Sequence, residues 1–458
     1  MNDWDVIIIG AGLSGLGAGI RLAIANKKVL MIEQHSVVGG LNSFFVKNGI
    51  LYDVGLHAMT NFVPRGAPHH PLTQLCRQLR IPYDALQLEE QRASKIQFPG
   101  VTLTFTNQFE HLLSDVRTYF PQEIDGLLKL DAAVMAYDDR ILESTPFIST
   151  CKTLPQWIHD PLLQNMLLLP LLYYGSAHTD DIDWRQFCTL YKAIYKEGFA
   201  RPKGGIRPLL KLLVQQYHTY GGVLRLKTPI QSIVLEGNKA TGVLLQSGEV
   251  LHAHCILSSV GYLETQALAS SVTKTPQPTL SFVETITVYP QPPQALGLDT
   301  TICFFNQQST IHYRTPESLI DLTSGVICIP ENYGTHPAQQ TTLRTTHLAN
   351  YTTWKRLSPS DYAINKQSCL KQSRMHAFEL SQGEEPSSVL GEDVFTPLTI
   401  ERFTGHRQGA IYGYPDKRYN GSSGYENLYL CGTDQGFLGI VGALLSGISI
   451  ANYRCLKG

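Results

Sequence analysis

Apolar residues without alternating polar ones mark the first strand that the chain predicts. After Asp5, residues 6–9 are all Val or Ile, a pattern typical of a strand covered on both faces. Residues 13–25 then place apolar side chains at helical spacing, and residues 28–32 predict a second buried strand. The order strand, helix, strand indicates a βαβ unit at the start of the chain.

The pattern changes twice further along the chain. Residues 63–200 have mainly helical spacing, whereas residues 201–260 predict one helix followed by short strands with glycine turns. Residues 428–431 predict another buried strand, followed by a glycine-rich turn and a helix of small residues. We therefore expect two interleaved domains with a ligand-binding crevice between them. The first comprises residues 1–62, 201–275 and 393–458, and the second residues 63–200 and 276–392.

The most apolar stretch of the chain is residues 161–174. We interpret it as a buried helix interrupted at Pro170. The alternative, a segment that dips into a membrane or lines a substrate site, stays open. At 14 residues the stretch is too short to span a bilayer, which needs roughly 20.

Composition narrows the possible partners. Lys and Arg total 37 and Asp and Glu 38, so we expect no nucleic acid partner. Charged residues make up 16% of the chain, below the roughly 25% of ordinary domains, which indicates apolar surface facing a core, a substrate cavity or a membrane. Nine scattered cysteines suggest neither disulfides nor a metal site. We expect a cytoplasmic protein without a signal peptide, which makes peripheral membrane contact at most.

Candidate chemistry begins where the first strand ends. Gly10, Gly12 and Gly15 fit G-x-G-x-x-G, in which the first glycine makes a tight turn, the second admits a pyrophosphate and the third lets the helix pack on the strand. Glu33 ends the second strand, where a carboxylate accepts both hydroxyls of an adenosine ribose. The context of these residues predicts a dinucleotide site.

These segments together resemble the flavin-dependent amine oxidoreductase superfamily, in its branch of phytoene desaturases, carotenoid isomerases and retinol saturases. The resemblance is strong at both ends of the chain and at residues 201–260. It implies an α/β fold, with a Rossmann-like FAD-binding domain of the amine-oxidase type interleaved with an α+β substrate-binding domain. The residues that it assigns to FAD, bound non-covalently, are Gly10, Gly12, Leu13, Ser14, Gly15, Glu33, Gly39, Gly40, Ser43, Gly55, Leu56, His57, Ile230, Gly432, Asp434, Gly439, Val441 and Gly442.

The chain departs from the family pattern at two places. Leu41 stands where amine oxidases usually have an arginine, and Gly432-Thr433-Asp434 separates the acid from the first glycine of the closing motif. The resemblance implies that Asp434 bonds ribityl hydroxyls and that the helix from Val441 directs its positive end at the flavin. The second departure is similar to the isomerase and saturase side of the branch.

One side chain is a candidate for catalysis. The resemblance places His57 beside the flavin, where it could position substrate or handle a proton. The more common alternative is a histidine held by neighbouring backbone groups. Because flavin carries the redox chemistry itself, no further catalyst is required.

Three functions are compatible with the sequence. The first is an FAD-dependent oxidoreductase that desaturates, saturates or isomerises a long apolar polyene, such as a carotenoid or retinoid. The second is a flavin amine oxidase, which Leu41 argues against. The third is a non-enzymatic prenyl-binding escort protein, which would need neither the glycines nor Glu33. We favour the first. Substrate identity, the direction of hydrogen transfer, the redox partner and the oligomeric state stay open.

Overall fold

A computed structural model describes residues 3–138, 142–143, 145–270 and 280–456. Its first sheet has the strand order β10-β11-β12-β1-β2-β9, with β18 beside β12. β1 runs parallel to both β12 and β2. These strands are β1 (Trp4–Ile9), β2 (Val29–Ile32), β9 (Val223–Arg225), β10 (Ile230–Glu236), β11 (Lys239–Leu245), β12 (Val250–Ser258) and β18 (Leu428–Leu430).

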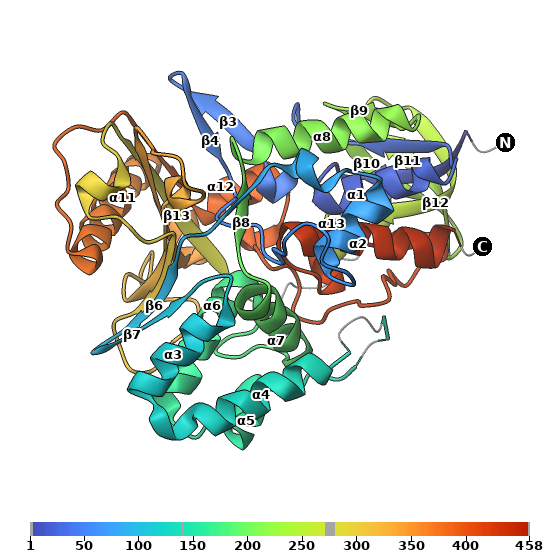
Figure 1. The fold of residues 1–458 in the computed structure, drawn as a ribbon. Helices are drawn as coiled ribbons and strands as arrows, with labels where there is room; N and C mark the ends of the chain where they lie inside the picture. Colours follow the sequence, from blue (N-terminus) through green and yellow to red (C-terminus); the bar gives the residue numbers. More distant parts are fainter. Residues whose placement is uncertain (1–2, 139–141, 144, 271–279, 457–458) are drawn as a thin grey trace.

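Three helices pack together beside this sheet, at the right of Figure 1. They are α1 (Leu13–Ile24), α8 (Ile206–Thr219) and α13 (Gly439–Ile450). Glycine lets α1 and α13 touch, since a Cβ on Gly447 would lie 1.9 Å from the carbonyl oxygen of Ser14. The two ends of the chain thus share one packed core.

The second sheet has the order β17-β13-β16-β15-β14-β6-β7 and is antiparallel except between β14 and β6. Its strands are β6 (Ser94–Phe98), β7 (Val101–Phe105), β13 (Ser281–Tyr289), β14 (Ile302–Asn306), β15 (Ser324–Cys328), β16 (Thr341–Ala349) and β17 (Gly391–Phe395). Two short pairs complete the strands, namely β3 (Phe44–Lys47) with β4 (Ile50–Asp53), and β5 (Leu88–Glu90) with β8 (Ala200–Pro202).

A further group of helices lies in the lower half of Figure 1. Those at the bottom of the view are α3 (Phe109–Tyr119), α4 (Ile124–Ala136), α5 (Thr150–Thr153), α6 (Pro161–Gly175) and α7 (Trp184–Tyr191). The remaining helices are α2 (Pro71–Leu79), α9 (Tyr262–Ala269), α10 (Tyr351–Arg356), α11 (Pro359–Ser381) and α12 (Pro397–Thr404).

The βαβ unit, the strands after residue 222 and the C-terminal strand and helix are confirmed. The prediction that residues 161–174 form a buried helix is also confirmed, but the expected interruption was wrong, because α6 continues through Pro170. The mainly helical pattern of residues 63–200 did not predict the strands β5, β6, β7 and β8, which are only three to five residues long. Such strands are too short for a period to stand out.

The division into two domains stays a prediction. The proposed boundary at residue 393 falls inside β17, which pairs with β13 in the second sheet. The proposed boundary between residues 275 and 276 lies outside the described residues.

Candidate functional site

A cavity of about 580 Å³ lies between the two sheets. Its lining includes the ends of β1 and β2 on one side and β13, β15 and β16 on the other. This volume is within the roughly 300–1,000 Å³ typical of ligand and cofactor sites. The two sheets therefore meet at one site large enough for a cofactor.

The glycine loop between β1 and α1 forms one wall of the cavity. A Cβ at Gly15 would lie 2.2 Å from the carbonyl oxygen of Gly10, so this glycine lets the helix approach the strand. At Gly12, in contrast, a Cβ would meet nothing within 4 Å. The open space beside Gly12 is the cradle that a pyrophosphate at the start of α1 requires.

Glu33 lies at the end of β2 and is 8% exposed. Its carboxylate accepts hydrogen bonds from the backbone N–H of Ala11 at 2.8 Å and of His35 at 2.9 Å. Gly39 donates its N–H to the carbonyl oxygen of Ala11 at 2.9 Å. Glu33 and the second glycine pair therefore both fix the first loop, and the acid stands at the cavity wall.

The C-terminal motif follows β18. Asp434 is buried, and its carboxylate accepts backbone N–H bonds from Tyr262 at 2.5 Å and Tyr414 at 2.6 Å. One oxygen also lies 4.0 Å from the ammonium of Lys417. Asp434 thus ties three segments together at the cavity wall, and the ribityl contact expected of it stays a prediction. The helix expected from Val441 begins two residues earlier, at Gly439.

Most of the predicted cofactor residues line the cavity. They are Gly10, Gly12, Leu13, Ser14, Glu33, Gly39, Gly40, Gly55, His57, Ile230, Gly432, Asp434 and Gly439. The predicted residues that do not line it are Gly15, Ser43, Leu56, Val441 and Gly442. Ser43 instead donates its hydroxyl to the carbonyl oxygen of Val38. Direct contact of any of these residues with a cofactor stays a prediction.

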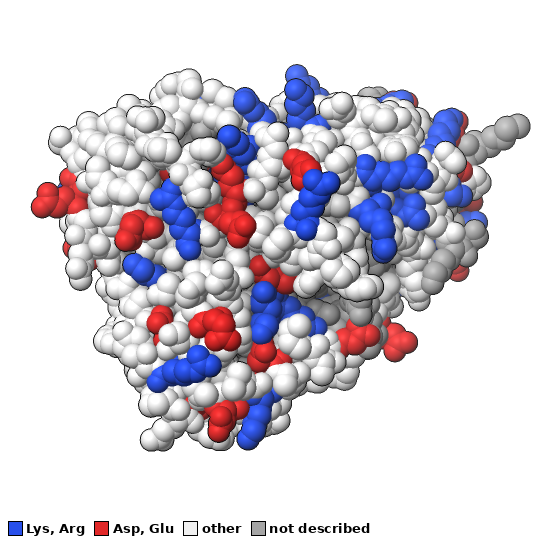
Figure 2. Space-filling view, viewed as in Figure 1, with Lys and Arg blue, Asp and Glu red and all other residues white. Residues whose placement is uncertain are grey.

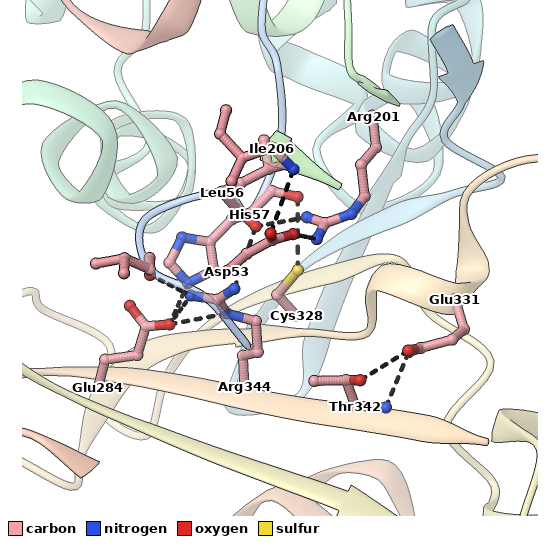
Figure 3. A network of polar contacts seen from close by, with 11 residues as sticks. Asp53, Leu56, His57, Arg201, Ile206, Glu284, Cys328, Glu331, Thr342 and Arg344 are labelled. Carbon is pink, nitrogen blue, oxygen red and sulfur yellow. Dashed lines mark hydrogen bonds and ion pairs between the residues drawn. The ribbon is translucent and has the colours of Figure 1, made fainter. Parts of the chain in front are cut away.

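A network of polar side chains lies beside the cavity (Figure 3), and its members His57, Glu284 and Thr346 line the cavity wall. Arg344, 1% exposed, donates from Nε to Oε1 of Glu284 at 2.7 Å and makes a second contact to the same oxygen from Nη2. The Nε2 atom of His57 lies 3.2 Å from the hydroxyl of Thr346 and 3.7 Å from the same Glu284 oxygen. The Nε2 atom of His57 therefore meets side-chain groups, and the catalytic role expected of His57 stays a prediction.

A second buried ion pair adjoins this network. Arg201 pairs with Asp53, and it also donates to the carbonyl oxygen of Leu56 at 2.5 Å. The other oxygen of Asp53 accepts the backbone N–H of Ile206 at 3.2 Å. Together with Arg344 and Glu284, this pair brings two guanidinium groups and two carboxylates into the network. Their charges balance, and buried ions are stable only when their charges are balanced in this way.

Burial and these charges shift the titration of the network. Desolvation lowers the pKa of His57 well below its ordinary value, and the positive charges of Arg344 and Arg201 lower this pKa further. The imidazole is therefore neutral near pH 7. Burial raises the pKa of Glu284, and the guanidinium of Arg344 opposes that shift.

The sequence analysis missed the second-sheet side of the site. Glu284, Thr346 and the aromatic side chains of Tyr173, Phe282 and Tyr412 all line the cavity. A signal was present in β13, whose residues Ser281–Tyr289 read SFVETITVY. A glutamate in an otherwise buried strand needs a partner or a function, and residues two apart on a strand share a face.

Comparisons with known proteins agree with this architecture. The model of the family described as flavin containing amine oxidoreductase matches residues 13–453. Prolycopene isomerase 2, chloroplastic, of an Oncidium hybrid cultivar is 23% identical over 98% of this chain and 84% of that protein. Human all-trans-retinol 13,14-reductase is 26% identical over 57% of this chain and 48% of that protein. A 4,4'-diapolycopene oxygenase of Methylomonas sp is 24% identical over 94% of both chains.

Solved structures share the fold. An oxidoreductase from Methanosarcina mazei superposes with a TM-score of 0.67 at 16% identity, over 98% of this chain and 100% of that one. Putrescine oxidase bound to putrescine gives a TM-score of 0.63 at 16% identity, over 98% of both chains.

The match to the family model, together with the glycine-lined cavity, identifies a flavin-binding oxidoreductase. The chain belongs to the flavin containing amine oxidoreductase family, and it is a flavin-dependent enzyme. Within the described part of the chain, no helix combines the length and the apolar character that crossing a membrane requires.

Proposed function

We propose that this protein is an FAD-dependent oxidoreductase that desaturates, saturates or isomerises a long apolar polyene of the carotenoid or retinoid kind. The observation that carries the proposal is the cavity itself. It runs from the glycine loop at one end to aromatic and aliphatic side chains of the second sheet and α6 at the other. Relatives named for prolycopene, retinol and diapolycopene chemistry support the same class of substrate.

The residues present fit a dinucleotide flavin. The open cradle at Gly12 would receive the pyrophosphate and Glu33 the adenosine ribose, with Ile230 at the adenine. A bound flavin supplies hydride transfer at its N5 atom. The chain contains no attachment motif that we recognise for a covalent flavin, so we infer non-covalent FAD.

The protein groups around the far end of the cavity would bind and orient an apolar substrate. Tyr173, Phe282, Val326, Tyr412 and Leu438 are at least half-buried and contribute apolar surface there. The Tyr412 hydroxyl contacts the carbonyl oxygen of Tyr173, which fixes one ring against α6. Such a wall excludes water from the reacting carbons, which protects reactive intermediates.

The amine oxidase alternative is less well supported. An amine substrate carries an ammonium group, and a buried ammonium is stable beside a carboxylate that has no other cationic partner. The carboxylate at the far end of the cavity, Glu284, is already neutralised by Arg344. The likeness to putrescine oxidase is at 16% identity and concerns the fold alone.

We further propose peripheral contact with a membrane, from which an apolar substrate would be drawn. Several large apolar side chains are exposed on the α3–α5 side of the molecule, namely Tyr119, Leu128, Met135, Phe147 and Ile148. On the face seen in Figure 2, acidic and basic groups are scattered among large uncharged areas. α6 is buried and is not the contact surface. Absence of binding to liposomes would count against this proposal.

One spectroscopic experiment tests the proposed function. The purified protein should show a flavin absorbance spectrum, and acid precipitation should release FAD into the supernatant. After anaerobic chemical reduction, addition of a carotenoid or retinoid precursor should either reoxidise the flavin, which indicates saturation, or change polyene geometry while the flavin stays reduced, which indicates isomerisation. Desaturation is assayed separately, by adding a more saturated precursor to the oxidised enzyme, which should reduce the flavin. Flavin that stays with the precipitate would contradict non-covalent binding, and no response to any polyene in either redox state would contradict the substrate class.

A further inference from the structure

Glu284 differs from the other carboxylates that line the cavity. Among the described lining residues, Glu33, Glu264 and Asp434 belong to the first-sheet side, and each accepts backbone N–H bonds. Glu284 comes from β13 in the second sheet, on the wall that also carries Phe282. It therefore stands where the apolar substrate of the proposed function would lie.

Only one of its two oxygens is engaged. Oε1 receives both contacts from Arg344 and is the oxygen nearest to His57. Within the part of the chain that the structure describes, Oε2 accepts no hydrogen bond, and Figure 3 shows it turned away from Arg344. One oxygen is thus fixed by the protein, while the other is available to a molecule in the cavity.

We propose that Glu284 is a catalytic residue that gives a proton to, or takes one from, a polyene carbon. Arg344 is its positioning residue. The inference rests on the proposed function and extends it to a named acid–base group.

The chemistry balances in each direction. In saturation, a hydride from reduced flavin bonds to one carbon of a C=C bond, and the other carbon takes the proton of the Glu284 carboxyl. The π bond is broken, two C–H bonds form, the flavin is oxidised and the polyene is reduced. Desaturation is the reverse, with the Glu284 carboxylate taking the proton. Isomerisation through a protonated polyene uses the same proton, which is added and then returned without net redox change.

The surroundings suit a proton carrier. Phe282 and Val326, which line the cavity beside Glu284, are themselves buried, and a positioned side chain transfers a proton efficiently in such a setting. The titratable and charged groups around Glu284 are Asp53, His57, Arg201, Cys328, Arg344 and Tyr412. His57 is neutral and lies beside the Glu284 oxygen that Arg344 binds. The Cys328 thiol donates to the carbonyl oxygen of His57, and the Tyr412 hydroxyl donates to that of Tyr173. Glu284 is therefore the group with an oxygen free to exchange a proton in the cavity. Burial raises its pKa toward the range in which a carboxyl can hold one.

An isosteric substitution that removes the acid tests this role in the flavin-loaded enzyme. Glu284→Gln keeps the size of the side chain and should lower kcat about 10²- to 10⁴-fold, with KM for the polyene and flavin affinity within about twofold of the parent. The matched control is Glu331→Gln. Glu331 is a half-buried carboxylate bonded to the N–H and hydroxyl of Thr342, and it does not line the cavity. This control should keep the parent kcat and pH profile.

Chemical rescue separates catalysis from structure. Formate added to Glu284→Ala should restore turnover at least tenfold, because it can supply the missing carboxyl, and formate should not accelerate the parent or Glu331→Gln. A Glu284→Gln enzyme with the parent's kcat and pH profile would overturn the inference. Failure of formate to restore turnover would also count against it.

An infrared measurement tests, without turnover, whether the Glu284 carboxyl meets the molecules bound in the cavity. The carboxyl band that Glu284→Gln removes should shift when flavin, and then a polyene, is added to the parent protein. A band that is insensitive to both would overturn the inference. If the parent converts no polyene, the proposed function fails, and this band still decides whether Glu284 faces the occupied cavity.

Discussion

Gly12 and Gly15 belong to one motif, but their surroundings predict opposite effects of a single added methyl group. Gly12 has a φ of −68°, which any residue can adopt, and open space where a Cβ would be. A Cβ on Gly15 would lie 2.2 Å from a backbone oxygen that cannot rotate away. Gly12→Ala should therefore spare the fold and obstruct the cofactor, whereas Gly15→Ala should damage the fold.

The expected sizes follow from these contacts. At Gly12, alanine is a weaker helix cap, which destabilises the fold by a few tenths to about 1 kcal/mol. Alanine also lowers the entropy of the unfolded chain, which stabilises the fold by about 0.4–1 kcal/mol. The free energy of unfolding should therefore change by less than about 1 kcal/mol. At Gly15, overpacking should cost about 1–3 kcal/mol or more. Loss of one charge-assisted N–H bond to phosphate should weaken flavin binding at Gly12→Ala by about 1.5–3 kcal/mol, or roughly 10- to 150-fold.

Two assays on the flavin-free proteins separate these effects. Urea unfolding followed by tryptophan fluorescence should give the parent midpoint for Gly12→Ala and a lower one for Gly15→Ala. Titration with FAD, followed by quenching of flavin fluorescence, should show the loss of affinity at Gly12→Ala. Parent affinity at Gly12→Ala, or a parent midpoint at Gly15→Ala, would refute the roles assigned to the two glycines.

Three further predictions concern single side chains. Glu33→Ala should lose about 1.5–3 kcal/mol of FAD affinity, measured by calorimetric titration, because it removes a charge-assisted acceptor for the ribose; equal affinity in the two proteins would contradict the assignment. His347 is buried, and desolvation lowers its pKa to about 4 in the folded protein. As the pH falls, the imidazole therefore takes up its proton at a higher pH in the unfolded chain than in the folded one. The free energy of unfolding should fall by about 3 kcal/mol as pH drops from about 6.5 to 4. In His347→Gln, the urea midpoint should fall less over the same pH range, because this contribution is missing. Arg201→Met should cost about 3–5 kcal/mol because it leaves Asp53 buried without its partner, and adding Asp53→Asn should recover part of the loss; additive effects in the double variant would argue against coupling.

The first-sheet side of the cavity could be predicted because its determinants are local. Gly10, Gly12 and Glu33 lie within one βαβ unit. The motif of that unit alone calls for residues that allow a tight turn and a close backbone approach and for an acid at the end of the second strand. The same locality explains why β1, α1 and β2 were located from the pattern of apolar residues. The interruption expected at Pro170 is absent because helix propensity is only a weak predictor of structure. The burial of α6 outweighs the poor helix propensity of this proline.

The sequence by itself determined the cofactor class, since close backbone approach to a phosphate needs particular residues at fixed spacing. Only the tertiary structure decided which side chains of the second sheet line the cavity. Glu284 and Arg344 are 60 residues apart, and Asp53 and Arg201 are 148 apart, with no motif joining them. The first pair depends on the register of β13 with β16, and the second on the approach of β8 to the end of β4; both arise when the whole chain folds. A buried charge is stable only beside an opposite charge, and the order of residues along the chain does not indicate which residue supplies that charge.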